Sequence, residues 1–262
     1  MHNVKTRITS VFMAALATIA IFSSASLARA NPTENIVLVH GAWADGSGWM
    51  PVYETLANQG FNVTMVQQPE TSFADDVAAT KRVLDLQNGP TILVAHSYGG
   101  SVITEAGVHP NVVGLVYVAA HAPDVGENES ALGKTMPSVL NDTAGAINTT
   151  PDNFTFLNQT DFLTLFAPDL PRQRAEFMSR SQVMAAASVF TTPLTAAAWK
   201  TKPSWGVVAG DDKIINPDLE RFYYTRAKSR TTEIPGASHV VYESHPQEVA
   251  AVIADAARSV PQ

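Results

Sequence analysis

The sequence predicts an α/β protein built on a mostly parallel sheet of six strands with helices on both faces. Short apolar runs rich in Val and Ile alternate along the chain with segments whose apolar residues recur at helical spacing. Strands joined by helical crossovers lie parallel, and a fully buried parallel strand reads as an unbroken apolar run. The six expected strands are 36–39, 61–66, 91–97, 112–120, 204–209 and 231–234.

The third of these runs ends in a serine on a sharp turn. Thr91–Ser97 passes directly into a helical pattern at 102–106, with Ala95 two residues before Ser97 and Gly99 two residues after it. A serine between strand and helix sits on a strained turn, and small flanking residues let the adjacent backbones pass each other. This context favours a nucleophile elbow with Ala in place of the first Gly. The alternative is a strand–loop–helix junction with an incidental serine.

Helical segments are expected between the strands. The segment 73–86 carries apolar residues on one side, and Ser72 or Thr71 is available as its N-cap. The segment 51–59 ends before Gly60, which is typical of a helix stop. The remaining expected helices are 102–106, 217–227 and 246–259.

The alternation breaks between 123 and about 202. No convincing strand is visible there, and helical pieces are expected around 161–166 and 171–190. A structureless loop of this length is uncommon in a compact domain. We therefore expect a helical cap inserted after the fourth strand, covering a pocket. Its phenylalanines either line that pocket or form the cap's own core; they are Phe154, Phe156, Phe162, Phe166, Phe177 and Phe190.

The first 30 residues have the pattern of a signal peptide. Lys5 and Arg7 precede an apolar stretch at 8–21, and Ala28–Ala30 fits a small-x-small cleavage site. The apolar stretch is shorter than a spanning helix needs, so a stable membrane anchor is not expected. The expected product is one domain over 31–262, exported to the periplasm or the medium.

The charge and the cysteine content of the chain limit the partners that it is expected to bind. The formal net charge is −7 and there is no cysteine. Nucleic acids and anionic membranes attract basic surfaces, so neither is an expected partner. Without Cys clusters a structural zinc site is not expected either, and no metal or other cofactor is predicted. A monomer or a homodimer is equally compatible with the sequence.

Three other predicted strands are followed by residues that can support catalysis by a serine. Asp211 and Asp212 follow the strand 204–209, and either can be the acid that orients a base. His239 follows the strand 231–234 and can be that base. The glycine-containing turn 40–43 follows the first strand and can aim backbone N–H groups at an oxyanion. Active groups gather at the carboxyl ends of parallel strands, so the order Ser, Asp, His predicts a catalytic triad with Ser97 as nucleophile.

The chain resembles the α/β-hydrolase superfamily, and within it the small bacterial serine hydrolases related to plant esterases and hydroxynitrile lyases. The matching stretches are 37–43 (VLVHGAW) with Trp49, 94–100 (VAHSYGG), 116–120 (VYVAA), 122–124 (APD), 212–215 (DKII) and 236–239 (GASH). In that group the acid precedes a Lys or Arg and an apolar pair, which selects Asp212. The resemblance also implies Ala42 and Tyr98 as oxyanion donors, with Trp43 the less favoured alternative to Ala42.

The resemblance separates the possible reactions. Hydroxynitrile lyases of this group need a lysine after the catalytic histidine and a threonine in the first turn, whereas this chain has Val240 and Gly41. Epoxide hydrolases and haloalkane dehalogenases use an aspartate nucleophile, where this chain has Ser97. An exported carboxylesterase acting on small esters is therefore expected. Trp43 and His121 are expected to contact the substrate, and His96 to pack or bond locally.

Two other function classes remain compatible with the same residues. A Ser-His-Asp triad also serves lactonases and cofactor-free perhydrolases of the haloperoxidase kind. Some members of this fold are binding modules that have lost catalysis, but they carry a broken triad or a blocked oxyanion turn. This sequence has neither feature.

Overall fold

A computed structural model describes residues 33–260, so the expected signal peptide lies outside the described residues. Its centre is a six-stranded sheet in the order β2-β1-β3-β4-β8-β9, in which all neighbouring strands are parallel. The strands are β1 (Asn35–Val39), β2 (Asn62–Val66), β3 (Thr91–Ser97), β4 (Val112–Ala120), β8 (Ser204–Ala209) and β9 (Arg230–Ile234). The predicted six-stranded parallel sheet is confirmed.

The burial of these strands explains why they could be predicted from the sequence. β3 is buried along its whole length and β4 at all but one position. Such strands need apolar residues on both faces, which gives the unbroken apolar runs. β9 is an edge strand whose first four residues are exposed, and it has the more polar sequence RTTEI.

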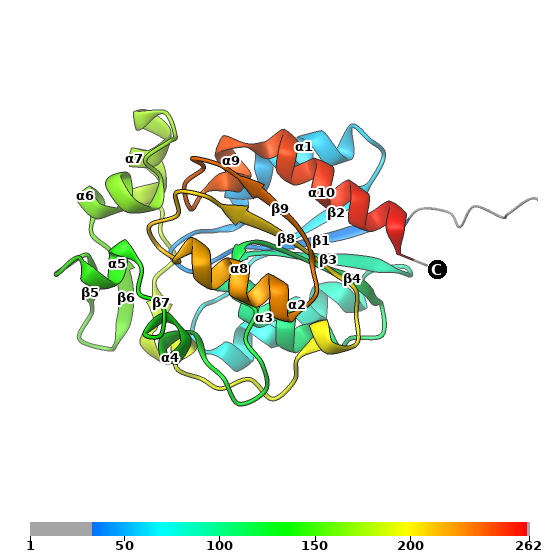
Figure 1. The fold of residues 1–262 in the computed structure, drawn as a ribbon, viewed down its shortest axis with the longest axis horizontal. Coiled ribbons are helices and arrows are strands. Elements are labelled where there is room, and N and C mark those ends of the chain that lie inside the picture. The colour runs from blue at the N-terminus through cyan, green and yellow to red at the C-terminus, as the bar shows by residue number, and fades with distance from the viewer. Residues whose placement is uncertain (1–32, 261–262) are drawn as a thin grey trace, which may run out of the picture.

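Helices cover both faces of the sheet (Figure 1). One face carries α1 (Met50–Ala57), α9 (Val241–Ser244) and α10 (Pro246–Ser259); the other carries α2 (Phe73–Asp85), α3 (Gly99–Ala106) and α8 (Pro217–Arg226). Ser72 caps α2, because its hydroxyl accepts the backbone N–H of Asp75 at 3.1 Å. None of the helices within residues 33–260 is long and apolar enough to cross a membrane.

The segment between β4 and β8 is not purely helical, so that part of the prediction is wrong. Besides short helices it contains a three-stranded antiparallel sheet in the order β5-β6-β7. These strands have two to four residues each, too few to show an alternating pattern. The expected helix 171–190 ends at Arg180. In chain order the elements are α4 (Glu129–Gly133), α5 (Val139–Asp142), β5 (Ile147–Thr149), β6 (Phe154–Leu157), α6 (Gln159–Asp161), the π-helical turn η2 (Phe162–Phe166), α7 (Arg172–Arg180), β7 (Ala185–Ala186), and the 3₁₀ turns η3 (Ala187–Phe190) and η4 (Ala198–Lys200).

This insert, as we call residues 123–202, lies at the carboxyl ends of the central strands (Figure 1). Two contacts fasten it to the loop after β8: the Leu140 N–H donates to the Lys213 carbonyl at 2.8 Å, and the Asn216 amide donates to the Pro137 carbonyl at 2.9 Å. On the other side Arg174 makes a two-pronged ion pair with Glu243 of α9. The insert is therefore bonded both to the loop after β8 and to α9.

Candidate active site

Ser97 sits on the tight turn that the sequence predicts. Its φ is +52°, a left-handed conformation that a non-glycine residue adopts only under constraint. The neighbouring glycines make the turn possible. A Cβ on Gly99 would lie 2.5 Å from the His40 carbonyl oxygen, and one on Gly100 would lie 2.0 Å from the His121 carbonyl oxygen. The start of α3 is thus pressed between the loops that follow β1 and β4.

Three predicted side chains are joined by hydrogen bonds in one row. His239 Nε2 lies 2.9 Å from Ser97 Oγ, and His239 Nδ1 lies 2.6 Å from Asp212 Oδ2. A carboxylate can only accept, so Nδ1 carries the proton and Nε2 is free to accept the serine hydroxyl proton. The side chains of His239 and Asp212 are both fully buried. This arrangement orients a base against a serine hydroxyl.

The structure shows which of the two neighbouring aspartates, Asp211 or Asp212, contacts His239. Asp212 Oδ1 accepts the backbone N–H groups of Ile214 at 2.7 Å and Ile215 at 3.0 Å, which leaves Oδ2 directed at His239. The side chain of Asp211 is 62% exposed and lies 3.9 Å from the ammonium of Lys213. Only Asp212 contacts the histidine.

The loop after β1 passes directly beside Ser97. A Cβ on Gly41 would lie 2.6 Å from the Cβ of Ser97, so a glycine is needed for this approach. His40 holds the loop, since its Nε2 accepts the Gln68 N–H at 3.0 Å while the Gln68 amide donates to the His40 carbonyl at 3.3 Å. Ala42 and Tyr98, the expected oxyanion donors, both border the cavity at Ser97.

The His96 side chain holds the loop that carries His239. Its Nε2 donates to the His239 carbonyl at 2.9 Å, and its ring centroid lies 4.5 Å from that of His239. Burial lowers the pKa of His96 well below its ordinary value, so it is neutral and acts as a hydrogen-bond donor. This agrees with the expected local bonding role.

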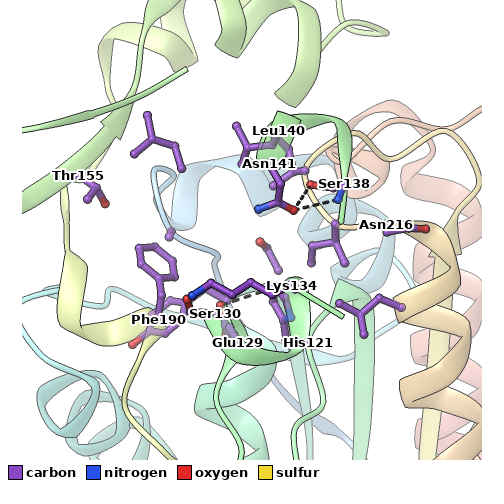
Figure 2. Close-up of a pocket in the computed structure, with 18 of the residues that line it drawn as sticks. His121, Glu129, Ser130, Lys134, Ser138, Leu140, Asn141, Thr155, Phe190 and Asn216 are labelled. Atoms are coloured by element: carbon purple, nitrogen blue, oxygen red, sulfur yellow. Dashed lines mark hydrogen bonds and ion pairs between the residues drawn. The ribbon is translucent and has the colours of Figure 1, made fainter. Parts of the chain in front are cut away.

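Ser97 borders a cavity of about 300 Å³. The cavity lies between the sheet and the insert (Figure 2). Trp43 and His121, the expected substrate contacts, both line it. The Trp43 indole N–H donates to Thr155 Oγ1 at 3.2 Å, and its ring packs 5.5 Å from that of Phe190. Part of the wall is apolar: Met136, Leu140, Ile147, Ile214, Ile215 and Leu219.

Of the six phenylalanines in the insert, Phe190 alone is among the residues that border this cavity. Phe162 and Phe166 are buried and stacked with their centroids 4.5 Å apart, so they form the insert's own core. The Phe166 ring also contacts that of His239, at 4.9 Å. Phe177 is 57% exposed.

The cavity also contains a carboxyl that the sequence did not reveal. Glu129, the first residue of α4, is 6% exposed and borders the cavity beside His121 (Figure 2). In the sequence it is an ordinary acidic residue in the first turn of a short helix, and no pattern marks it as buried. Within residues 33–260 no three His, Asp or Glu side chains group closely enough to hold a metal ion.

The fold and this site define the class of protein. The sequence matches the alpha/beta hydrolase family over residues 36–252, and the chain belongs to that family. It is 33% identical over 112 residues to a carbendazim hydrolyzing esterase of Nocardioides sp. (strain SG-4G), covering 37% of this chain and 46% of that protein, so the match spans about half of that relative. It is 25% identical over 245 residues to a probable hydrolase, R7, of Phoma sp. (strain ATCC 20986 / MF5453), covering 85% of this chain and 97% of that protein.

Solved structures show the same fold. A pyrethroid hydrolase from Sphingobium faniae JZ-2 superimposes with a TM-score of 0.72 at 22% identity, covering 86% of this chain and 97% of that chain. Polyneuridine aldehyde esterase superimposes with a TM-score of 0.72 at 16% identity, covering 85% of this chain and 98% of that chain. These structures therefore share the fold that the resemblance implies for this chain.

Proposed function

We propose that this protein is a serine hydrolase of the carboxylesterase type, acting on small esters through an acyl-enzyme. The observation that carries the proposal is the buried hydrogen-bonded row from Asp212 through His239 to Ser97, which ends at the cavity. Ser, His and Asp in this geometry activate a hydroxyl as nucleophile on several unrelated folds. Two similar proteins are described as an esterase and a probable hydrolase, which supports ester cleavage.

The mechanism follows from the positions of the atoms. Ser97 Oγ attacks the ester carbonyl carbon while its proton passes to His239 Nε2, 2.9 Å away. Asp212 stabilises the imidazolium through its 2.6 Å bond to Nδ1. The proton then leaves with the alcohol. Water attacks the acyl-enzyme by the same route, which releases the carboxylic acid and restores the Ser97 hydroxyl.

The developing oxyanion needs donors on the cavity side of Ser97. The backbone N–H groups of Ala42 and Tyr98 serve this role, because both residues border the cavity and Tyr98 directly precedes α3, whose N-terminus favours negative charge.

Hydrolysis is favoured over cyanohydrin cleavage. Val240 follows His239, so no lysine is present there to receive cyanide, and Gly41 replaces the threonine.

The test is hydrolysis of p-nitrophenyl esters of increasing acyl length, with Ser97→Ala as the matched variant. Turnover by the wild type that is lost in the variant supports the proposal, together with fluorophosphonate labelling of the wild type alone. A folded wild-type protein that neither cleaves an ester nor reacts with the fluorophosphonate contradicts it and favours a binding module.

Export is the second part of the proposal. The residues up to Ala30 are expected to direct secretion and then to be removed. Expression of the full chain in a bacterium, followed by N-terminal sequencing of the protein from periplasm and medium, tests this. A start near Asn31 supports export, whereas intact Met1 in the cytoplasm contradicts it.

A further inference from the structure

Four polar side chains lie in a series beside the cavity, each close to the next. The Ser101 hydroxyl donates to Glu129 Oε1 at 2.5 Å, Glu129 Oε2 lies 3.5 Å from His121 Nε2, and His121 Nδ1 lies 3.2 Å from the Tyr223 hydroxyl. Ser101 and Tyr223 are buried and lie behind the wall. Glu129 and His121 border the cavity itself (Figure 2).

The proposed hydrolysis uses neither of these two side chains. A carboxyl and an imidazole cost free energy to bury unless their hydrogen bonds are made. Glu129 Oε1 has its donor in Ser101, and His121 Nδ1 has its partner in Tyr223. The other two polar atoms, Oε2 and Nε2, face each other at 3.5 Å, which is too far for a good hydrogen bond.

Both groups are uncharged near neutral pH. Burial raises the pKa of Glu129 to about 8 and lowers the pKa of His121 to about 3. A protonated carboxyl offers a donor and an acceptor, and a neutral imidazole offers one or the other at Nε2. An uncharged pair of this kind does not select an ionic ligand. It suits a neutral group that donates one hydrogen bond and accepts another.

We propose that Glu129 and His121 form a subsite for a hydroxyl group of the substrate, so that the preferred substrates are small hydroxylated esters. The inference rests on the proposed esterase function and adds the substrate class to it. A hydroxyl at this place bridges Oε2 and Nε2 and completes the hydrogen bonds of both. A purely apolar ester displaces water from the pair and leaves both atoms without partners.

The experiment compares matched esters by release of acid in a pH-indicator assay. Methyl butyrate is compared with methyl 2-hydroxybutyrate and methyl 3-hydroxybutyrate, and propyl butyrate with 2-hydroxyethyl butyrate. The first two pairs place the hydroxyl on the acyl side and the last on the alcohol side. Each ratio of kcat/KM is divided by the ratio of the two hydroxide-catalysed rates, which removes the difference in intrinsic reactivity.

We expect a normalised preference of at least about tenfold for the hydroxylated member of one pair, since sites built to bond a hydroxyl reject analogues that lack it. Glu129→Leu brings this ratio close to one, Glu129→Gln retains part of it, and Glu176→Gln on the exposed face of α7 retains all of it. The ratio is read within each variant, so a change in overall activity does not affect it.

Two results overturn the inference while the esterase function stands: equal normalised rates in all three pairs, or a preference that survives in Glu129→Leu. The wild-type ratios decide the matter alone if Glu129→Leu does not fold. No turnover of any ester, together with no fluorophosphonate labelling of Ser97, overturns the proposed function and this inference with it.

Discussion

Asp211 and Asp212 are adjacent in the chain, but their environments differ completely. Asp212 is held by two backbone N–H groups and bonded to His239, whereas Asp211 is largely in solvent. We therefore expect Asp212→Asn to lower kcat on p-nitrophenyl butyrate by roughly 10³- to 10⁴-fold, because an amide in this place favours the wrong histidine tautomer.

Asp211→Asn is the matched control. Its ion pair with Lys213 is long and exposed, and such pairs contribute less than about 1 kcal/mol. The expected change in kcat is less than about twofold. Equal losses in the two variants, or a larger loss in Asp211→Asn, would contradict the assignment of the acid.

A site residue is predictable where its chemistry and its position in the chain point to the same role. Ser97 and His239 each follow a legible strand, so their meeting at the sheet's carboxyl edge was predictable. The choice of Asp212 over Asp211 needed the family pattern, because both follow the same strand. Glu129 was not predictable, since its burial depends on how α4 docks against α3 through Ser101.

Gly100, at the start of α3, allows that helix to lie close to the end of β4. A Cβ there would lie 2.0 Å from the His121 carbonyl oxygen, which is backbone and cannot move aside. Gly100→Ala should lower the free energy of unfolding by roughly 1–3 kcal/mol, the usual range of overpacking in a close-packed interior. Urea unfolding followed by circular dichroism measures this.

Gly133 in α4 provides the control for that substitution. No heavy atom would lie within 4 Å of a Cβ at Gly133. Gly133→Ala should therefore change the free energy of unfolding little, or raise it by about 0.5–1 kcal/mol through the higher helix propensity of alanine. A Gly100→Ala protein as stable as Gly133→Ala would show that the turn is less crowded than described.

Asp169 of the insert binds the residue that precedes His239. Its carboxylate accepts the Ser238 N–H at 2.9 Å and the Ser238 hydroxyl at 2.5 Å. We expect Asp169→Ala to lower kcat by roughly 10- to 100-fold with little change in KM, because a small displacement of His239 weakens proton transfer while the cavity wall is unaltered.

Asp169→Asn keeps one acceptor oxygen and should recover part of the lost kcat. Asp152→Ala, an exposed aspartate elsewhere in the insert, should leave kcat unchanged. A merely structural role for Asp169 would instead lower the melting temperature and leave kcat of the folded enzyme intact at low temperature.

The strands of the central sheet and the helices that cover it were predicted more accurately than the elements of the insert. The helix 246–259 matches α10 at both ends, since a proline opens it and its apolar face is continuous. β5, β6 and β7 were missed because they are short and held largely by pairing with each other. Such pairing depends on contacts distant in sequence, which local periodicity does not report.

The whole molecule contains several buried acids, which affect how stability varies with pH. Burial raises the pKa of Glu129 from 4.5 to about 8, and it raises the pKa values of Glu70 and Glu220 well above 4.5. The folded state then holds protons that the unfolded state has lost. Stability is therefore greatest at low pH for these groups and falls as pH rises through the folded pKa.

The buried histidines change the free energy of unfolding in the opposite direction, and they do so mainly at lower pH. The pKa values of His40, His96 and His121 lie below 6.5 when folded, whereas an unfolded histidine is half charged at pH 6.5 and loses that charge as the pH rises. Above pH 6.5 each histidine therefore contributes at most half a proton to the difference between the two states, and each buried acid up to one. Between pH 6.5 and 8 the buried acids therefore determine whether stability rises or falls with pH. We expect the free energy of unfolding to decrease there, by up to about 1.4 kcal/mol per pH unit for each group.

Glu129→Gln isolates one of these contributions. Urea unfolding at pH 6.5, 7.2 and 8.0 should show a shallower decrease in the variant than in the wild type, since glutamine does not titrate. Glu176→Gln, at a side chain that is 45% exposed, should follow the wild-type curve. Parallel curves for the wild type and Glu129→Gln would mean that Glu129 does not titrate between folded and unfolded states as described.

The insert's bonds to the sheet loops have a consequence for how this protein can acquire new substrates. Leu140 and Asp169 each touch a loop that carries a member of the row Ser97–His239–Asp212. Exchanging the whole insert with that of a relative would therefore disturb the alignment of the row along with the cavity. Single changes at positions that border the cavity without bridging to those loops, such as Ile147 and Lys134, leave the alignment intact. Diversification of specificity, in nature or in directed evolution, should proceed first through such positions.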